Sequence, residues 1–229
     1  MCLQAVRFHK MISSIIFDLD GTLIDSVIDV RAALNQLLSE NGRHPLTDAD
    51  VRTMVGEGVK PMLTNAFART GEALSPDQVD DLVARYLELY INANHDTKII
   101  YPGVIKLLDT FMSHNISMGV CTNKPKISTH IVLKNLGLAQ YFKAVVCPED
   151  TPFRKPDPRH AEQALRSIGG ARESSLFVGD SESDLRSAQS AEIPCVLVSY
   201  GYAQSSVSQL SADFVIGTFA ELLPIVMGS

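Results

Sequence analysis

The sequence predicts an α/β protein in which a parallel sheet carries helices on both faces and a helical insert follows the first strand. Two observations lead to this prediction. From residue 101 onward, short apolar runs alternate with segments of helical spacing, which is the pattern of strand and crossover-helix units. Between residues 26 and 95, every periodic segment is helical and no strand is indicated. We therefore expect a core of residues 11–25 and 96–229, interrupted by an insert of residues 26–95.

The elements follow from this periodicity in chain order. The first strand is the apolar run 15–17, and the insert holds helices at 27–40, about 48–70 and 76–93, with a loop at 55–60. The core then continues with helices at 101–111, 127–136, 157–168, 183–191 and 219–226, and with strands at 116–121, 143–147, 176–178, 195–198 and 214–216. Short apolar strands alternating with helices imply a Rossmann-like sheet that is buried on both faces.

Composition and charge exclude several functional classes. A 45% hydrophobic chain with a net charge of −6 can bury a full core, and this charge argues against nucleic acid or an anionic membrane as partner. The four cysteines show no metal-binding spacing and sit mostly in apolar runs, as expected of buried thiols in a reducing compartment. No apolar run approaches the ~20 residues of a membrane span. We expect a cytoplasmic protein whose residues 1–10 form an unstructured lead-in without a signal peptide.

The most informative segment is the run from Asp18 to Thr22, which reads Asp-Leu-Asp-Gly-Thr and directly follows the first strand. Residues i and i+2 share a face of a strand, so Asp18 and Asp20 can both lean over the carboxyl edge of the sheet. Gly21 allows the backbone to turn sharply there. One carboxylate could then attack phosphorus while the other handles the proton of the leaving group. A helix cap or turn is the alternative for this motif taken alone.

Suitable groups also follow the other predicted strands. Thr122 and Asn123 offer a hydroxyl and backbone N–H groups, and a proline-flanked loop presents Lys155. Asp180 and Asp184 lie four residues apart, about one turn of a helix. In open parallel sheets, ligands bind at the carboxyl ends of the strands. These groups are therefore expected to meet at one edge.

In this order and at these positions, the motifs resemble those of the haloacid dehalogenase superfamily. The resemblance implies that Asp18 is the nucleophile, that Asp20 is the general acid and base, and that Thr122 and Lys155 hold the transferring phosphoryl group. Asp20 also indicates the branch, because a dehalogenase has no alcohol leaving group to protonate. The resemblance therefore implies a phosphate ester hydrolase.

The resemblance further implies a magnesium ion at this site. Its ligands would be carboxylates of Asp18 and Asp180 and the backbone carbonyl of Asp20, with Asp184 completing the site. Magnesium prefers oxygen ligands in near-octahedral geometry. Without such an ion and Lys155, an anionic carboxylate would be repelled by an anionic phosphate.

The insert is similar in position and helical character to the C1 caps of this superfamily, which close over the active site. Several stretches also resemble the bacterial phosphoglycolate phosphatases, namely 17–26, 55–58, 101–104, 122–125 and 200–202. The same motifs occur in relatives that cleave pyrophosphate or sugar phosphates. The expected partner is a small phosphorylated metabolite, 2-phosphoglycolate first among them, and no oligomeric state is indicated.

Within the insert, Lys60 and Arg52 are the candidates for pairing with a carboxylate of the substrate, with Asn123 as a further substrate-binding candidate from the core. Solvated helix charges are the alternative for both cations. Two other functions stay open at this point. A β-phosphoglucomutase-like mutase would use the same first step, and a non-catalytic binding protein could share the fold.

Overall fold

The computed structural model describes residues 11–93, 96–202 and 207–228. The expected lead-in at residues 1–10 and Cys2 lie outside the described residues. Cys121, Cys147 and Cys195 are buried and free, as their apolar neighbours predicted. None of the helices in the described ranges has the length and apolar character needed to cross a membrane.

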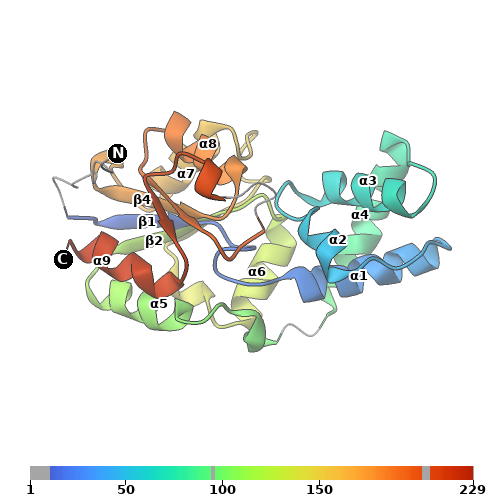
Figure 1. The fold of residues 1–229 in the computed structure, drawn as a ribbon, viewed down its shortest axis with the longest axis horizontal. Coiled ribbons are helices and arrows are strands. Elements are labelled where there is room, and N and C mark those ends of the chain that lie inside the picture. The colour runs from blue at the N-terminus through green and yellow to red at the C-terminus, as the bar shows by residue number, and fades with distance from the viewer. Residues whose placement is uncertain (1–10, 94–95, 203–206, 229) are drawn as a thin grey trace.

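One sheet of parallel strands runs through the core, with the first strand of the chain in its middle (Figure 1). The strand order is β3-β2-β1-β4-β5-β6. The strands are β1 (Ser14–Phe17), β2 (Ser117–Cys121), β3 (Ala144–Val146), β4 (Ser175–Gly179), β5 (Cys195–Val198) and β6 (Phe214–Ile216). This arrangement confirms the predicted α/β fold with a Rossmann-like parallel sheet.

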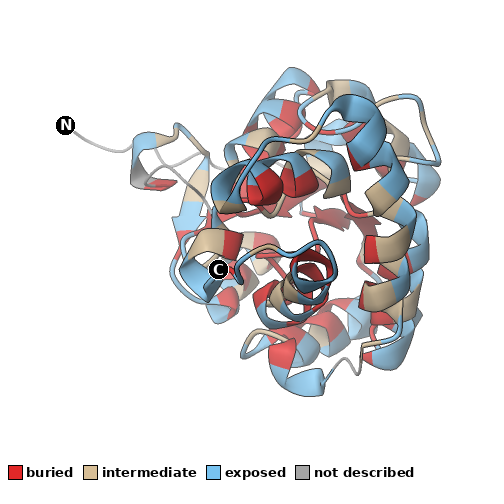
Figure 2. Cartoon of the chain, turned by 90° about the vertical axis from the view of Figure 1, so that its right-hand side faces the viewer, coloured by how far each residue is buried: buried red, intermediate tan, exposed pale blue. Residues whose placement is uncertain are grey.

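Helices cover both faces of the sheet, and β1 shows why its sequence is continuously apolar. Ile15 and Phe17 pack in the same hydrophobic cluster as α5, α6 and α9, whereas Ile16 packs with α7 and α8 on the other face. These helices are α5 (Val104–Ser113), α6 (Lys126–Asn135), α7 (Pro158–Ser167), α8 (Glu182–Ser190) and α9 (Leu222–Met227). Figure 2 shows the buried strands inside a shell of helices with exposed outer faces. A parallel sheet needs this cover on both sides.

The described residues of the insert form helices and no strand, and they lie beyond one end of the sheet (Figure 1). Its helices are α1 (Val27–Glu40), α2 (Asp48–Arg52), α3 (Val59–Thr70) and α4 (Pro76–Ile91). Thr47 and Ser75 start α2 and α4 with capping boxes. The segment predicted at about 48–70 forms two helices, because Gly56 and Gly58 adopt positive φ angles of 115° and 102° in the expected loop. α4 also contacts α6 of the core.

The register of the sheet aligns the ends of its three central strands. Phe17 of β1 lies opposite Val120 of β2 and Val178 of β4. The residues that follow these strands therefore emerge side by side at one edge. The insert packs over this edge, so the ends of β1, β2 and β4 and the insert together form the candidate site.

Candidate active site

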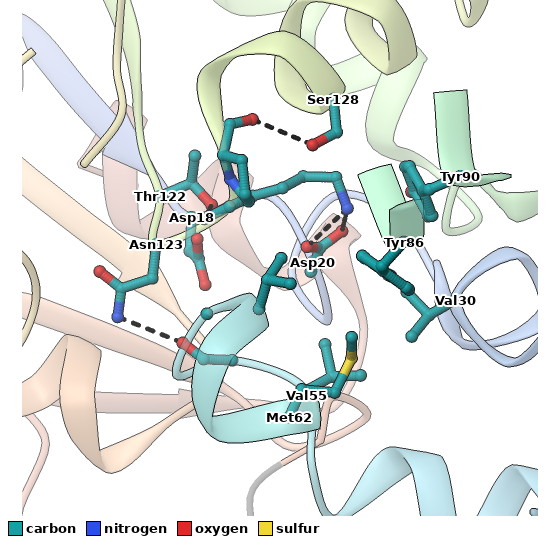
Figure 3. A pocket seen from close by; sticks show the side chains of 15 residues that line it. Asp18, Asp20, Val30, Val55, Met62, Tyr86, Tyr90, Thr122, Asn123 and Ser128 are labelled. Atoms are coloured by element: carbon teal, nitrogen blue, oxygen red, sulfur yellow. Dashed lines mark hydrogen bonds and ion pairs between the residues drawn. The ribbon is translucent and has the colours of Figure 1, made fainter. Parts of the chain in front are cut away.

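Asp18 and Asp20 follow β1 at this edge, and both line one pocket (Figure 3). Gly21 has a φ of 82°, a left-handed conformation that glycine adopts without a Cβ clash. Its N–H donates a 2.8 Å hydrogen bond to the carbonyl of Ile24, which closes the turn. The turn holds both carboxylates at the edge of the sheet, as the spacing of the motif predicted.

Lys155 places a buried ammonium group between two carboxylates. Its Nζ lies 2.8 Å from Asp18 Oδ1 and 2.7 Å from Asp184 Oδ1. Burial works to lower the pKa of Lys155, but the two carboxylates outweigh it and raise the pKa, so the ammonium group stays charged. Burial raises the pKa of Asp18 to about 7, with Lys155 opposing the shift and Asp184 adding to it. Lys155 is thus the main group that favours an ionised Asp18.

Asp180 joins Asp18 and Asp184 in a cluster in which each residue offers a carboxylate oxygen within 4.8 Å of the others. Burial, and then the charges of Asp184 and Asp18, raise the pKa of Asp180 well above its usual range. Asp180 Oδ2 accepts a 2.6 Å hydrogen bond from the N–H of Tyr202. Gly201 leaves room for this approach, since a Cβ there would come within 2.3 Å of Asp180.

The composition of this cluster fits a hard divalent cation. Three buried carboxylates face the single ammonium group of Lys155, so the ionised cluster has two more negative than positive charges. An uncompensated buried charge is costly, and one divalent ion would balance this excess. The donors are all oxygens, which Mg²⁺ prefers.

Asp184 also has a structural task at the start of α8. Its Oδ2 accepts hydrogen bonds from the N–H groups of Asp180 and Ser181, at 3.2 and 3.0 Å, and from the Ser181 hydroxyl at 2.6 Å. Ser181 Oγ accepts in turn from the N–H of Asp184, which completes a capping box. Because Oδ1 pairs with Lys155, both oxygens of Asp184 have protein partners. Asp184 therefore orients Lys155 as well as adding charge to the cluster.

Thr122 and Asn123 take different positions after β2. Thr122 is buried, lines the pocket, and accepts a 3.2 Å hydrogen bond from the N–H of Lys124. The side chain of Asn123 bonds to other parts of the chain: Nδ2 donates to the carbonyls of Gly56 and Lys155, and Oδ1 accepts from the N–H of Lys155. Asn123 therefore connects the Lys155 loop to the loop of the insert, and Figure 3 shows its bond to the insert.

Lys124 is the cation of the pocket that the sequence interpretation missed. Its Nζ lies 3.0 and 3.2 Å from the two carboxylate oxygens of Asp20, and its side chain is 6% exposed. The same ammonium group lies 4.4 Å from the ring centroid of Tyr90 on α4, within cation–π range. The available signal was its place two residues beyond Thr122, at the end of a central strand.

The two cations proposed for the insert have other partners. Arg52 Nη2 lies 2.6 Å from Asp25 Oδ2, and its guanidinium group stacks 5.3 Å from the ring centroid of Tyr202. Lys60 pairs with Asp80 on α4 at 2.6 Å, and its side chain is 61% exposed. Neither residue is among those that line the pocket, so the structure does not bring them to the candidate substrate.

Instead, the insert lines the pocket with apolar and aromatic side chains (Figure 3). The contributing residues are Val30, Val55, Val59, Met62, Tyr86 and Tyr90. The core side is polar and carries the carboxylates of Asp18 and Asp20. The pocket thus has a charged floor and an apolar roof, which suits a small substrate whose charged groups all lie near the sheet edge.

Two further groups near the site are neutral. Burial raises the pKa of the Cys121 thiol well above its usual range, which argues against a nucleophilic role. His160 on α7 is fully buried, and its Nδ1 accepts a 3.2 Å hydrogen bond from the N–H of Lys155. Burial, with a smaller contribution from the charge of Lys155, lowers the pKa of His160 to about 4.

This shift makes the stability of the protein depend on pH. An unfolded histidine has a pKa of about 6.5, so between pH 6.5 and 4 the unfolded chain binds a proton that the folded His160 does not. The contribution of His160 to the free energy of unfolding should therefore fall as pH falls, by about 3 kcal/mol at pH 4. Urea unfolding at a series of pH values from 7 to 4.5 measures this decrease in the free energy of unfolding. In His160→Asn, which keeps a neutral acceptor, this part of the slope should disappear, and an unchanged slope would contradict the assignment.

Comparisons with known proteins agree with this geometry. The family model of the haloacid dehalogenase-like hydrolases matches residues 15–198. The chain belongs to this family. The match begins in β1 and ends in β5, so it includes the insert and all the strand ends that carry the site. The expected superfamily is therefore confirmed.

The sequence also matches named relatives over nearly its whole length. It is 37% identical to the phosphoglycolate phosphatase of Agrobacterium fabrum, over 91% of this chain and 90% of that protein. It is 38% identical to the enzyme of the same name from Rhodospirillum rubrum, over 93% and 90% of the two chains. A crystal structure of a predicted phosphoglycolate phosphatase from Haemophilus somnus superimposes with a TM-score of 0.86 at 25% identity, covering 95% and 99% of the two chains.

Proposed function

We propose that the protein is a magnesium-dependent phosphatase that hydrolyses 2-phosphoglycolate through a phosphoryl group carried on Asp18. The observation that carries this proposal is the placement of Asp18 against Lys155, with Asp20 in the same pocket. The phosphoglycolate phosphatases of similar sequence support the choice of substrate. The reaction is thus the hydrolysis of a phosphate monoester to an alcohol and inorganic phosphate.

In the first step, an ionised oxygen of Asp18 attacks phosphorus in line with the ester oxygen. The new bond joins Asp18 to phosphorus, the bond to the ester oxygen breaks, and Asp20 gives its proton to the leaving alkoxide. Lys155 neutralises negative charge beside Asp18, and the Thr122 hydroxyl can donate to a phosphoryl oxygen. A magnesium ion held by Asp18 and Asp180 would offset the charge of the phosphoryl oxygens.

In the second step, water replaces the aspartate on phosphorus. Asp20, now ionised, takes a proton from the attacking water, and the bond between Asp18 and phosphorus breaks. Inorganic phosphate leaves, and Asp18 regains its carboxylate. Asp20 must therefore act first as an acid and then as a base, which is possible because the attacking water takes the place that the ester oxygen has left, opposite Asp18.

The helical insert, residues 26–95, would act as a cap over the core of residues 11–25 and 96–229. The contact between Asn123 and the Gly56 carbonyl and the apolar roof of the pocket support this role. A closed cap keeps bulk water away while the phosphoryl group is transferred. We place the reaction in the reducing cytoplasm, since the three described cysteines are free thiols.

A substrate panel tests the proposal. Phosphate release should be measured with Mg²⁺ for 2-phosphoglycolate, hexose phosphates, nucleoside monophosphates and pyrophosphate. We expect kcat/KM for 2-phosphoglycolate to exceed the others at least about tenfold, because Val30, Val55 and Met62 offer sugar hydroxyls no hydrogen-bonding partner.

Three outcomes would contradict the proposal. Faster cleavage of hexose phosphates or pyrophosphate would show that the proposed substrate is wrong but would leave the proposed phosphatase chemistry intact. Dependence on a bisphosphate activator, without net phosphate release, would indicate a mutase. No turnover of any ester with Mg²⁺ would favour a non-catalytic protein.

A further inference from the structure

Lys124 is buried in the pocket, yet the proposed mechanism gives it no task. It is the one cationic side chain among the described residues that line this pocket. Its ammonium group contacts both oxygens of Asp20 and the face of the Tyr90 ring. Burying an ammonium group costs free energy unless it gains partners, and Asp20 and Tyr90 are the partners that hold Lys124 in the pocket.

The position of Lys124 relative to Asp20 limits what it can bind. In the proposed function, Asp20 touches the ester oxygen of the substrate. Lys124 Nζ lies 3.0 Å from a carboxylate oxygen of Asp20, so it is within reach of a group two or three bonds from the ester oxygen. An ammonium group has three N–H donors, which allows it to keep a bond to Asp20 while it donates to a second acceptor.

The other described residues that line the pocket include no second cationic side chain for an anionic group. Val30, Val55 and Met62 line the side opposite the sheet edge, and Arg52 and Lys60 pair with carboxylates outside the pocket. A negative group on the leaving portion of a substrate therefore has Lys124 as its available cationic partner.

We propose that Lys124 determines substrate specificity by binding a carboxylate on the carbon next to the ester oxygen. The inference rests on the proposed function and assigns this recognition to the core, in place of the insert. 2-Phosphoglycolate has such a carboxylate. Lys124 would hold it against the floor of the pocket, while Val30, Val55 and Met62 exclude longer or hydroxyl-bearing chains.

A comparison of two esters tests this role. Isobutyl phosphate has the size of 2-phosphoglycolate but carries an uncharged isopropyl group in place of the carboxylate. In Lys124→Met, the ratio of kcat/KM for 2-phosphoglycolate to that for isobutyl phosphate should fall by about 100-fold. Lys124→Gln, which keeps a donor for Asp20 but removes the charge, should lower the ratio similarly. Lys134→Met, a substitution of an exposed lysine on α6, should leave the ratio unchanged.

A structural role for Lys124 predicts a different result. If the lysine only positions Asp20, both esters should lose activity equally, and an unchanged ratio in both variants would overturn the inference. Binding to Asp18→Asn provides a measurement without turnover. Adding Lys124→Met should weaken the affinity for 2-phosphoglycolate and leave that for isobutyl phosphate within a few fold.

The same experiment separates this inference from the proposed function. If the wild-type protein hydrolyses neither ester with Mg²⁺, the phosphatase proposal fails. If it prefers 2-phosphoglycolate and this preference survives in Lys124→Met and Lys124→Gln, recognition by Lys124 fails alone.

Discussion

Asp18→Asn is expected to lower kcat for phosphate release by at least about 10⁴-fold, because an amide oxygen cannot replace a carboxylate as nucleophile. The fold should survive, since Asn has the same shape and Asp18 lies in a cluster of like charges. Phosphate release at saturating substrate measures the loss, and circular dichroism with thermal unfolding checks the structure.

Asp25→Asn provides a matched control from the same turn. Asp25 pairs with Arg52 and Tyr202 and does not line the pocket. This variant should keep far more activity than Asp18→Asn. Comparable turnover in Asp18→Asn and the wild-type protein would show that the nucleophile lies elsewhere.

Removal of Asp180 should separate metal binding from folding. In the wild-type protein, Mg²⁺ at about 100 times its dissociation constant should raise the unfolding temperature by about 5–10 °C. In Asp180→Asn, that increase should be lost and turnover should fall by at least about 10³-fold. The metal-free variant should unfold no lower than the metal-free wild type, because the substitution relieves repulsion from Asp18 and Asp184 and keeps an acceptor for the Tyr202 N–H.

Asp80→Asn is the control for this measurement. Asp80 is an exposed carboxylate on α4 that pairs with Lys60, so the variant should keep the full thermal shift with Mg²⁺. If Asp180→Asn also keeps the shift, Asp180 is not a metal ligand. Chelation with EDTA should remove turnover from the wild-type protein and restore it when Mg²⁺ is added back.

The fold could be predicted because its signals are local. The run that ends at Phe17, the glycines at 56 and 58, and the helical spacing of the insert each act within a few residues. Fully buried parallel strands need apolar side chains on both faces, so the strands could be identified one by one. Their spatial order, with β1 between β2 and β4, is a long-range property that these patterns did not specify.

The residues of the candidate site could be predicted only where the residue types and their position in a motif indicate a chemical function. Asp18 and Asp20 stand beside the end of a strand, Asp180 directly follows another, and Lys155 lies in the proline-flanked loop after a third. The partners of cations cannot be identified from a motif in this way, because an ion pair depends on which side chains the fold brings together. Lys124 pairs with Asp20, 104 positions away in the chain.

The cations of the insert show the same limit. Lys60 and Arg52 looked suitable for a substrate carboxylate because they flank a glycine loop. In the folded protein, Asp80 and Asp25 neutralise them instead. Sequence alone does not show whether a cation already forms an ion pair with a carboxylate of the same protein. Lys124 was overlooked because a lysine just before a helix is common on protein surfaces, and the sequence does not show that the fold buries this one.

The central claim is that the phosphoryl group passes through Asp18, and covalent trapping tests it most directly. Asp20→Asn should still accept a phosphoryl group from an aryl phosphate, whose leaving group departs without a proton, but should hydrolyse the intermediate slowly. After rapid acid quenching in the presence of Mg²⁺, mass spectrometry should find one phosphoryl group on Asp18. Turnover with an unmodified Asp18, or a phosphoryl group on another residue, would contradict the account.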